Sequence, residues 1–210
     1  MSSSEAARLL DAAHFAALKH AAQRRKDPQG TPYINHSLGK ARSPARGWKR
    51  ALRGRRPRLT RPSPPLPAGV AQILAQEAGV ADVAVLQAAL LHDTVEDTDT
   101  TFAEIEGRFG EDVRRLVEEV TDDKTLPKAE RKRLQVEHAA RGSRGARLLK
   151  LADKLHNLRD LNRCTPQGWS EDRVQEYFLW ASEVVKGLHG TSPPLEEKLQ
   201  ELFKARGISV

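Results

Sequence analysis

Residues 83–97 read VAVLQAALLHDTVED, an apolar run that ends in a histidine, an aspartate and two further acidic residues. This composition predicts a buried helix from Ala81 to Asp97. On a continuous helix of about 100° per residue, the polar side chains at its end share an arc of about 140°. These side chains are His92, Asp93, Glu96 and Asp97. Because unpaired charge in an interior is costly, a bound divalent cation is their simplest partner.

Helical periodicity extends over most of the remaining chain. Further helices are predicted at 5–23, 70–79, 101 to 107 or 110, 111–120, 128–141, 146–162, 170–188 and 192–203. The sequence contains no internal repeat and no strand with regular alternation, so it predicts an all-α fold, a helical bundle. The apolar positions of the first helix are Leu9, Leu10, Ala13, Ala17 and Leu18. Those of the helix that begins at Ser170 are Val174, Phe178, Ala181, Val185 and Leu188.

The segment from Lys40 to Gly69 departs from this pattern. It holds ten Lys or Arg residues, no Asp or Glu, and six of the twelve prolines. Proline interrupts helices, and high charge with few apolar residues predicts disorder. Outside the segment 25 basic and 28 acidic residues remain, so the net charge of +7 comes from this segment alone. We therefore predict a single domain over residues 1–210, interrupted by a disordered basic insert at 40–69.

The cysteine content and the lack of long apolar runs indicate the compartment. A lone cysteine, Cys164, precludes a disulfide within the chain and favours a reducing environment. No apolar run approaches the roughly 18 residues of a membrane span. The N-terminal residues lack the basic-then-apolar order of a secretory signal. We expect a cytoplasmic protein that does not associate with membranes.

Two histidines and two aspartates are candidate metal ligands: His36, His92, Asp93 and Asp153. This donor set suits Mn²⁺, Fe²⁺ or Zn²⁺, and Mg²⁺ less well. Such an ion makes water more acidic, and the two carboxylates at 96 and 97 would position that water or carry its proton.

Spacing alone leaves other interpretations open. The pair His92-Asp93 also fits a helix end that turns polar as it leaves the core. Asp153 fits the polar face of a surface helix, which it shares with Asn157 and Asp160.

Three motifs together resemble a known family. They are YINH at 33–36, ALLHDTVEDT at 89–98 and KLADKLHNLR at 150–159. Their order is similar to the H…HD…D pattern of the HD-domain metal phosphohydrolases. The match is closer to the hydrolase domain of the RelA/SpoT stringent-response enzymes, and the chain resembles the stand-alone small alarmone hydrolases, including the metazoan form. The resemblance covers nearly everything except residues 40–69.

The resemblance implies a site and a reaction. It implies an Mn²⁺ ion on His36, His92, Asp93 and Asp153, with Glu96, Asp97 and Asn157 as catalytic residues. It further implies that Arg25, Lys26, Lys128, Arg173 and Tyr177 contact the substrate. The implied reaction removes the 3′-pyrophosphate of guanosine 3′,5′-bis(diphosphate), ppGpp, and gives GDP and diphosphate. Apart from the family, the run at 24–26 is typical of a solvated cluster of charges.

Two alternatives remain open. Metazoan members of the family are also linked to removal of the 2′-phosphate of NADPH, which would use the same site. The second alternative is a catalytically weakened variant, in which residues 40–69 uncouple His36 from the helix that positions it. The basic insert of such a variant would bind polyanions non-specifically. Trp48 is the only aromatic residue of the insert, so we expect no specific nucleic-acid partner. The sequence leaves the oligomeric state unknown.

Overall fold

The computed structural model describes residues 4–23, 33, 36 and 69–209. These residues form helices and loops without any strand, which confirms the predicted all-α fold. None of their helices is long and apolar enough to cross a membrane. Except for Gly69, the predicted insert at 40–69 lies outside the described residues, so the interruption of the domain stays a prediction.

From α3 onward, short loops join the helices of the described chain. The first half contains α1 (Glu5–Lys19), α3 (Val70–Gln72) with a π-helical turn at Ile73–Glu77, α4 (Val83–Leu91), α5 (Thr94–Asp97), α6 (Phe102–Phe109) and α7 (Glu111–Val120). The second half contains α8 (Lys128–His138) with a 3₁₀ turn at Ala139–Arg141, α9 (Arg144–Arg163), α10 (Glu171–Lys186) and α11 (Pro193–Ala205).

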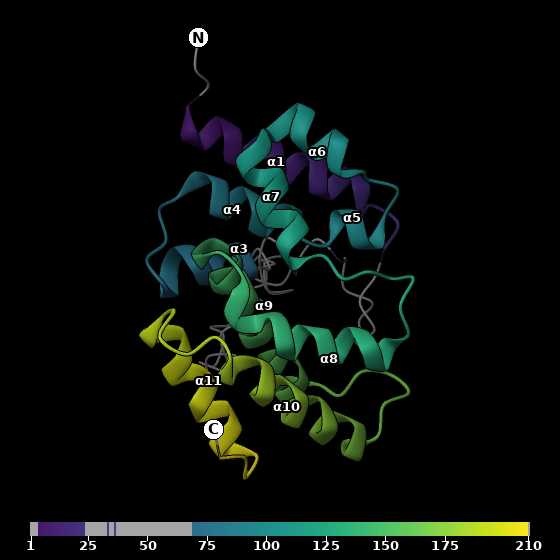
Figure 1. The fold of residues 1–210 in the computed structure, drawn as a ribbon, viewed down its shortest axis with the longest axis vertical. Helices are drawn as coiled ribbons and strands as arrows, with labels where there is room; N and C mark the ends of the chain where they lie inside the picture. The colour runs from purple at the N-terminus through teal and green to yellow at the C-terminus, as the bar shows by residue number, and fades with distance from the viewer. Residues whose placement is uncertain (1–3, 24–32, 34–35, 37–68, 210) are drawn as a thin grey trace, which may run out of the picture.

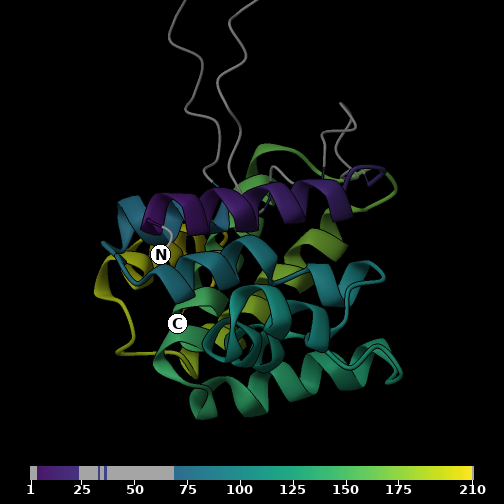
Figure 2. The ribbon, with the colours of Figure 1, turned by 90° about the horizontal axis from the view of Figure 1, so that it is seen from above.

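Helix α9 is the central element of the bundle. It contacts α3, α4 and α7 as well as α10 and α11, and Figure 1 shows these two groups above and below it. Figure 2 shows that α1 and α8 lie at opposite edges of the molecule. Leu151, Leu155 and Leu158 of α9 are fully buried, as predicted for its apolar side. The polar side of α9 is therefore held at a fixed place in the fold.

The predicted apolar stripes have different outcomes in α10 and α1. All five predicted positions of the helix that begins at Ser170 are buried. The stripe predicted for the first helix is only partly confirmed: Leu9 and Ala13 pack against the core, but Leu10 is 69% and Leu18 is 61% exposed. Helix α1 instead buries Ala12, Phe15 and Ala16. It packs on α4, and the Phe15 ring meets Phe109 edge-to-face at 5.4 Å. The small alanines beside Phe15 allow α1 to lie close to α4. Helix α1 ends at Lys19 rather than at residue 23.

The continuous helix predicted over 81–97 is interrupted at His92 and Asp93. Helix α4 ends at Leu91 and α5 begins at Thr94. The His92 ring binds the carbonyl oxygen of Ala89 through Nδ1 at 2.9 Å, and the Thr94 hydroxyl donates to the carbonyl of Leu91 at 2.6 Å. Side chains thus occupy carbonyls that a continuous helix would use for its own backbone bonds. The polar side chains at 92–97 therefore do not share the 140° arc predicted for a continuous helix. His92 and Asp93 lie instead at the break between α4 and α5.

Candidate metal centre

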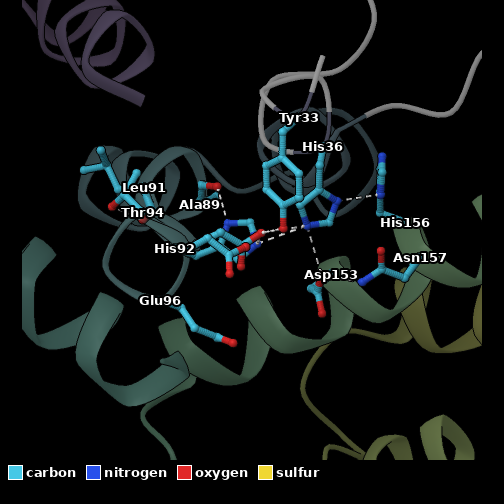
Figure 3. Close-up of polar contacts among 12 residues, drawn as sticks. Tyr33, His36, Ala89, Leu91, His92, Thr94, Glu96, Asp153, His156 and Asn157 are labelled. Carbon is cyan, nitrogen blue, oxygen red and sulfur yellow. Dashed lines mark hydrogen bonds and ion pairs between the residues drawn. The ribbon is translucent and has the colours of Figure 1, made fainter. Parts of the chain in front are cut away.

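Four side-chain atoms from three separate segments lie close together, and Figure 3 shows three of their residues, His36, His92 and Asp153, around one place. The Nε2 atoms of His36 and His92 lie 3.1 Å apart. Oδ2 of Asp93 lies 3.4 Å from the first and 3.2 Å from the second of these atoms. Oδ1 of Asp153 lies 3.2 Å from Nε2 of His36. The ligand atoms of His36, His92 and Asp93 therefore lie within 4.8 Å of one another, and Asp153 approaches this group through His36.

Each imidazole is held through its other nitrogen. Nδ1 of His92 lies 2.9 Å from the carbonyl oxygen of Ala89. Because a carbonyl only accepts, this nitrogen carries a proton, and Nε2 is the atom that can present a lone pair to a cation once it is deprotonated. Nδ1 of His36 lies 2.8 Å from Nδ1 of His156. Both histidines are buried, with 3% and 7% exposure for His36 and His92, so bulk water does not compete for their Nε2 atoms.

The two carboxylates of the cluster are also held by donors. The hydroxyl of Tyr33 donates to Oδ2 of Asp93 at 2.9 Å. The amide of Asn157 donates to Oδ1 of Asp153 at 2.8 Å, and the ammonium of Lys154 donates to Oδ2 of Asp153 at 3.0 Å. These donors restrict the carboxylates to the orientation in which one oxygen of each faces the histidines.

The electrostatics of the cluster favour ionised carboxylates. Burial opposes charge on both aspartates, but the neighbouring imidazoles hold the pKa of Asp93 well below the usual range. Lys154 and the same imidazoles lower the pKa of Asp153 in the same way. Burial also opposes charge on His92, yet the adjacent Asp93 raises the pKa of His92 to about 9. The two buried carboxylates thus demand positive charge beside them. A proton on His92 meets this demand in the free protein, and a divalent cation is the partner that would replace it.

A cavity of about 450 Å³ opens beside the cluster. His36, Asp93 and Asp153 line it together with the predicted catalytic residues Glu96 and Asn157. We call it the metal cavity. The other predicted catalytic residue, Asp97, is not among the lining residues of this cavity, and its carboxylate is paired with Lys124.

Glu96 is the carboxylate best placed to exchange a proton. Burial is the main cause that raises its pKa to about 7, and the negative charges of Asp93 and Asp122 add to this effect. Nζ of Lys124 and Nη1 of Arg131 lie 3.9 and 3.7 Å from its Oε1. A carboxyl group with this pKa changes its protonation state near neutral pH.

A second cavity of about 300 Å³ shares Trp169, Tyr177 and Trp180 with the first. Its lining includes four basic side chains, Lys128, Arg131, Lys132 and Arg173, and we call it the cationic cavity. The structure therefore brings the predicted substrate residues Lys128, Arg173 and Tyr177 together. The other two predicted substrate residues, Arg25 and Lys26, lie outside the described residues.

Sequence reasoning missed three residues that hold the ligands. Tyr33 and His156 stand inside the quoted motifs, but no role was expected for them or for Lys154. One signal was available for His156: it follows Asp153 by three residues, so both lie on the same face of a helix. The contact of Tyr33 with Asp93 joins residues 60 positions apart, and no local pattern of the sequence indicates it.

Comparison with known proteins shows which proteins this chain is similar to. Residues 48–179 match the family model described as HD domain. A human protein named guanosine-3′,5′-bis(diphosphate) 3′-pyrophosphohydrolase MESH1 is 63% identical over 207 residues, covering 99% of each chain. The Drosophila melanogaster protein of that name is 47% identical over 208 residues, also covering 99% of each. A solved structure described as "A metazoan ortholog of SpoT hydrolyzes ppGpp and plays a role in starvation responses" has a TM-score of 0.82 and 47% identity, covering 100% of this chain and 99% of that one.

Proposed function

Because the chain belongs to the HD-domain family, and is 63% identical over nearly its whole length to a curated ppGpp 3′-pyrophosphohydrolase, we propose that it is a ppGpp 3′-pyrophosphohydrolase. Water would attack the phosphorus attached to the 3′-oxygen, and the bond between that phosphorus and the 3′-oxygen would break. The products are GDP with a free 3′-hydroxyl and diphosphate. The observation that carries the proposal is the convergence of two imidazoles and two ionised carboxylates beside a cavity. The resemblance to the RelA/SpoT-type alarmone hydrolases is thereby confirmed.

The donor set fits a divalent metal. The two Nε2 atoms lie 3.1 Å apart, and each can present a lone pair because the Nδ1 atom of the same ring has another partner. Two imidazole nitrogens and two carboxylate oxygens form a mixed set that suits Mn²⁺. We propose Mn²⁺ as the ion, held by His36, His92, Asp93 and Asp153.

Each of the three proposed catalytic residues would have its own role beside the ion. A divalent cation supplies Lewis-acid polarisation of a phosphoryl oxygen and makes water acidic enough to attack near neutral pH. Glu96, with a pKa of about 7, would take the proton of the attacking water at its carboxylate and release it afterwards. Asn157 would keep Asp153 oriented and present its amide to the cavity. Asp97 would act through Lys124, with which it is paired.

The cationic cavity supports a substrate with several phosphates. Burial and the neighbouring Lys128 lower the pKa of Lys132, so an anion bound there would relieve repulsion between cations. Arg173 offers a planar guanidinium that matches phosphate oxygens. We propose that the 3′-diphosphate lies at the metal, and that the phosphates at the 5′ end lie in the cationic cavity. The aromatic rings shared by the two cavities would cover the nucleoside between them.

The expected setting of the enzyme follows from the same reasoning. A small nucleotide substrate needs neither a nucleic-acid partner nor a membrane. We propose a cytoplasmic location, in keeping with the lone cysteine of the chain.

The test compares ppGpp and NADPH as substrates of the full chain loaded with Mn²⁺. We expect GDP and diphosphate in equal amounts from ppGpp, and no turnover after the metal is removed with a chelator. Faster release of orthophosphate from NADPH would favour the 2′-phosphatase alternative. The absence of turnover of either substrate, in a chain that binds Mn²⁺, would favour the weakened variant.

A further inference from the structure

His156 is a buried histidine of α9 that contacts a candidate ligand without lining either cavity described above. It is 2% exposed, and its Nδ1 lies 2.8 Å from Nδ1 of His36. The two rings are nearly perpendicular, with their centroids 4.5 Å apart and a 71° angle between their planes. Figure 3 shows His156 on the side of His36 that faces away from His92.

The direction of this hydrogen bond follows from the position of His36. Nε2 of His36 faces His92, Asp93 and Asp153, and it can bind a cation only through a free lone pair. The proton of a neutral His36 must then be on Nδ1. Nδ1 of His36 therefore donates, and Nδ1 of His156 accepts. This arrangement fixes the tautomer of both rings.

We propose that His156 is a positioning residue for the metal centre: it holds His36 in the tautomer and ring orientation that present Nε2 to the cation. The inference rests on the proposed function, because it concerns the metal of that same site. It adds a residue to which the motif pattern assigns no role.

The other histidine of the cluster shows why His36 needs such a partner. His92 is oriented by the carbonyl of Ala89, in the helix that precedes it. His36 is oriented instead by a side chain 120 residues away in the sequence. That side chain belongs to the same helix as Asp153, and it lies three positions further along, on the same face. Helix α9 thus provides one ligand directly and positions a second one through His156.

Two substitutions separate hydrogen bonding from packing. His156→Asn keeps an acceptor, because Oδ1 of Asn and Nδ1 of His are both bonded to Cγ. His156→Leu fills the space but cannot accept a hydrogen bond. Leu158→Ala is the matched control: it lies on the same helix and is fully buried, so its loss lowers stability without touching His36.

The measurement is the affinity of the metal-free full chain for Mn²⁺, followed by the electron paramagnetic resonance signal of free Mn²⁺. We expect His156→Leu to bind Mn²⁺ about 10- to 100-fold more weakly, as is typical when the partner of a ligating histidine is lost. His156→Asn should recover most of this loss, and Leu158→Ala should bind like the wild type despite a lower melting temperature. At saturating Mn²⁺ the Leu variant should regain kcat, with an unchanged KM for ppGpp.

Two results would overturn the inference while leaving the proposed function intact: wild-type affinity in His156→Leu, or an equal loss in the Leu and Asn variants. A wild-type chain that binds no Mn²⁺ would instead overturn the proposed function, and this inference with it.

Discussion

The metal centre and the cationic cavity lie side by side, but different forces hold their side chains. In the metal centre every candidate ligand has a hydrogen-bond partner of its own, and the side chains of Asp93 and Asp153 are only 18% and 20% exposed. In the cationic cavity two of the four basic groups, Arg173 and Lys132, rest on aromatic rings. The Arg173 guanidinium lies 4.3 Å from the Trp169 centroid, and the Lys132 ammonium lies 4.6 Å from that of Trp180.

This difference indicates that the metal centre and the cationic cavity have different roles. Buried, hydrogen-bonded ligands keep one geometry, which a chemical step requires. Long cationic side chains stacked on rings can shift to follow the phosphates of a nucleotide. Substitutions in the metal centre should therefore reduce metal content and kcat, whereas substitutions in the cationic cavity should change KM.

The largest effect is expected for Asp153→Asn. It removes one negative ligand but keeps a side chain of the same shape beside Asn157 and Lys154. We expect kcat to fall by more than about 10³-fold, because loss of a residue that merely supports a ligand already costs about 10- to 100-fold. Metal content by mass spectrometry should fall with it. Asp112→Asn, at an exposed position of α7, is the control that should keep both. Full activity in Asp153→Asn would contradict the role of the metal centre in the chemical step.

Glu96→Gln should have the next largest effect, and it tests the proton step alone. We expect kcat to fall about 10²- to 10⁴-fold while Mn²⁺ content stays at the wild-type level. Glu183→Gln, on the exposed surface of α10, should leave both unchanged.

The pH profile provides an independent check of the role of Glu96. A base must be ionised to accept a proton, so wild-type activity should rise with pH through the pKa of Glu96, which is about 7 in the metal-free protein. A bound cation would move this midpoint downward, because it favours the ionised carboxylate. The acid limb should vanish in Glu96→Gln, and a limb that persists there would assign the titration to another group.

Arg173→Gln sharpens the comparison from the other cavity. We expect the KM for ppGpp to rise about 10- to 100-fold, as is typical for the loss of a charge-assisted hydrogen bond of about 1.5–3 kcal/mol. kcat at saturation and metal content should change little. Lys186→Ala, an exposed position on the same helix, serves as the control. A large fall in kcat with constant KM would place Arg173 at the reacting phosphate instead.

Removal of residues 40–68 should have the smallest effect on catalysis. Nε2 of His36 already lies within 3.4 Å of ligand atoms of the other three candidate residues. We therefore expect the shortened chain to keep its Mn²⁺ content and its kcat, and to lose salt-sensitive binding to polyanions. A clear rise in turnover or in bound metal after the deletion would instead support the uncoupling of His36 by the insert.

The sequence predicted the helices more reliably than their ends or their faces. Periodicity located α9 and α10 together with their buried stripes, since burial of one face is a repeating local signal. It was only partly right for α1, where Phe15 and two alanines are buried while Leu10 and Leu18 are exposed. Which face of a short amphipathic helix is buried depends on its partner, here α4, and no local pattern contains that information.

The candidate site was also predicted in part: its ligands were predicted, but not the contacts that hold them. The order of the motifs predicted that His36, His92, Asp93 and Asp153 form one site. Their spacing alone was also compatible with surface positions for some of these residues. The break after Leu91 was not predicted, because it depends on side chains that compete for the carbonyls of Ala89 and Leu91. The supporting contacts from Tyr33 and His156 join distant residues, so they emerge only when the chain is folded.

The account depends most on a single cation bound among four atoms. The direct test is a crystal of the full chain grown with Mn²⁺ and measured at a wavelength where manganese scatters anomalously. We predict one anomalous peak per chain in contact with Nε2 of His36, Nε2 of His92, an oxygen of Asp93 and an oxygen of Asp153. A peak elsewhere in the molecule, or no peak among these four atoms in a chain that turns over ppGpp, would contradict the account.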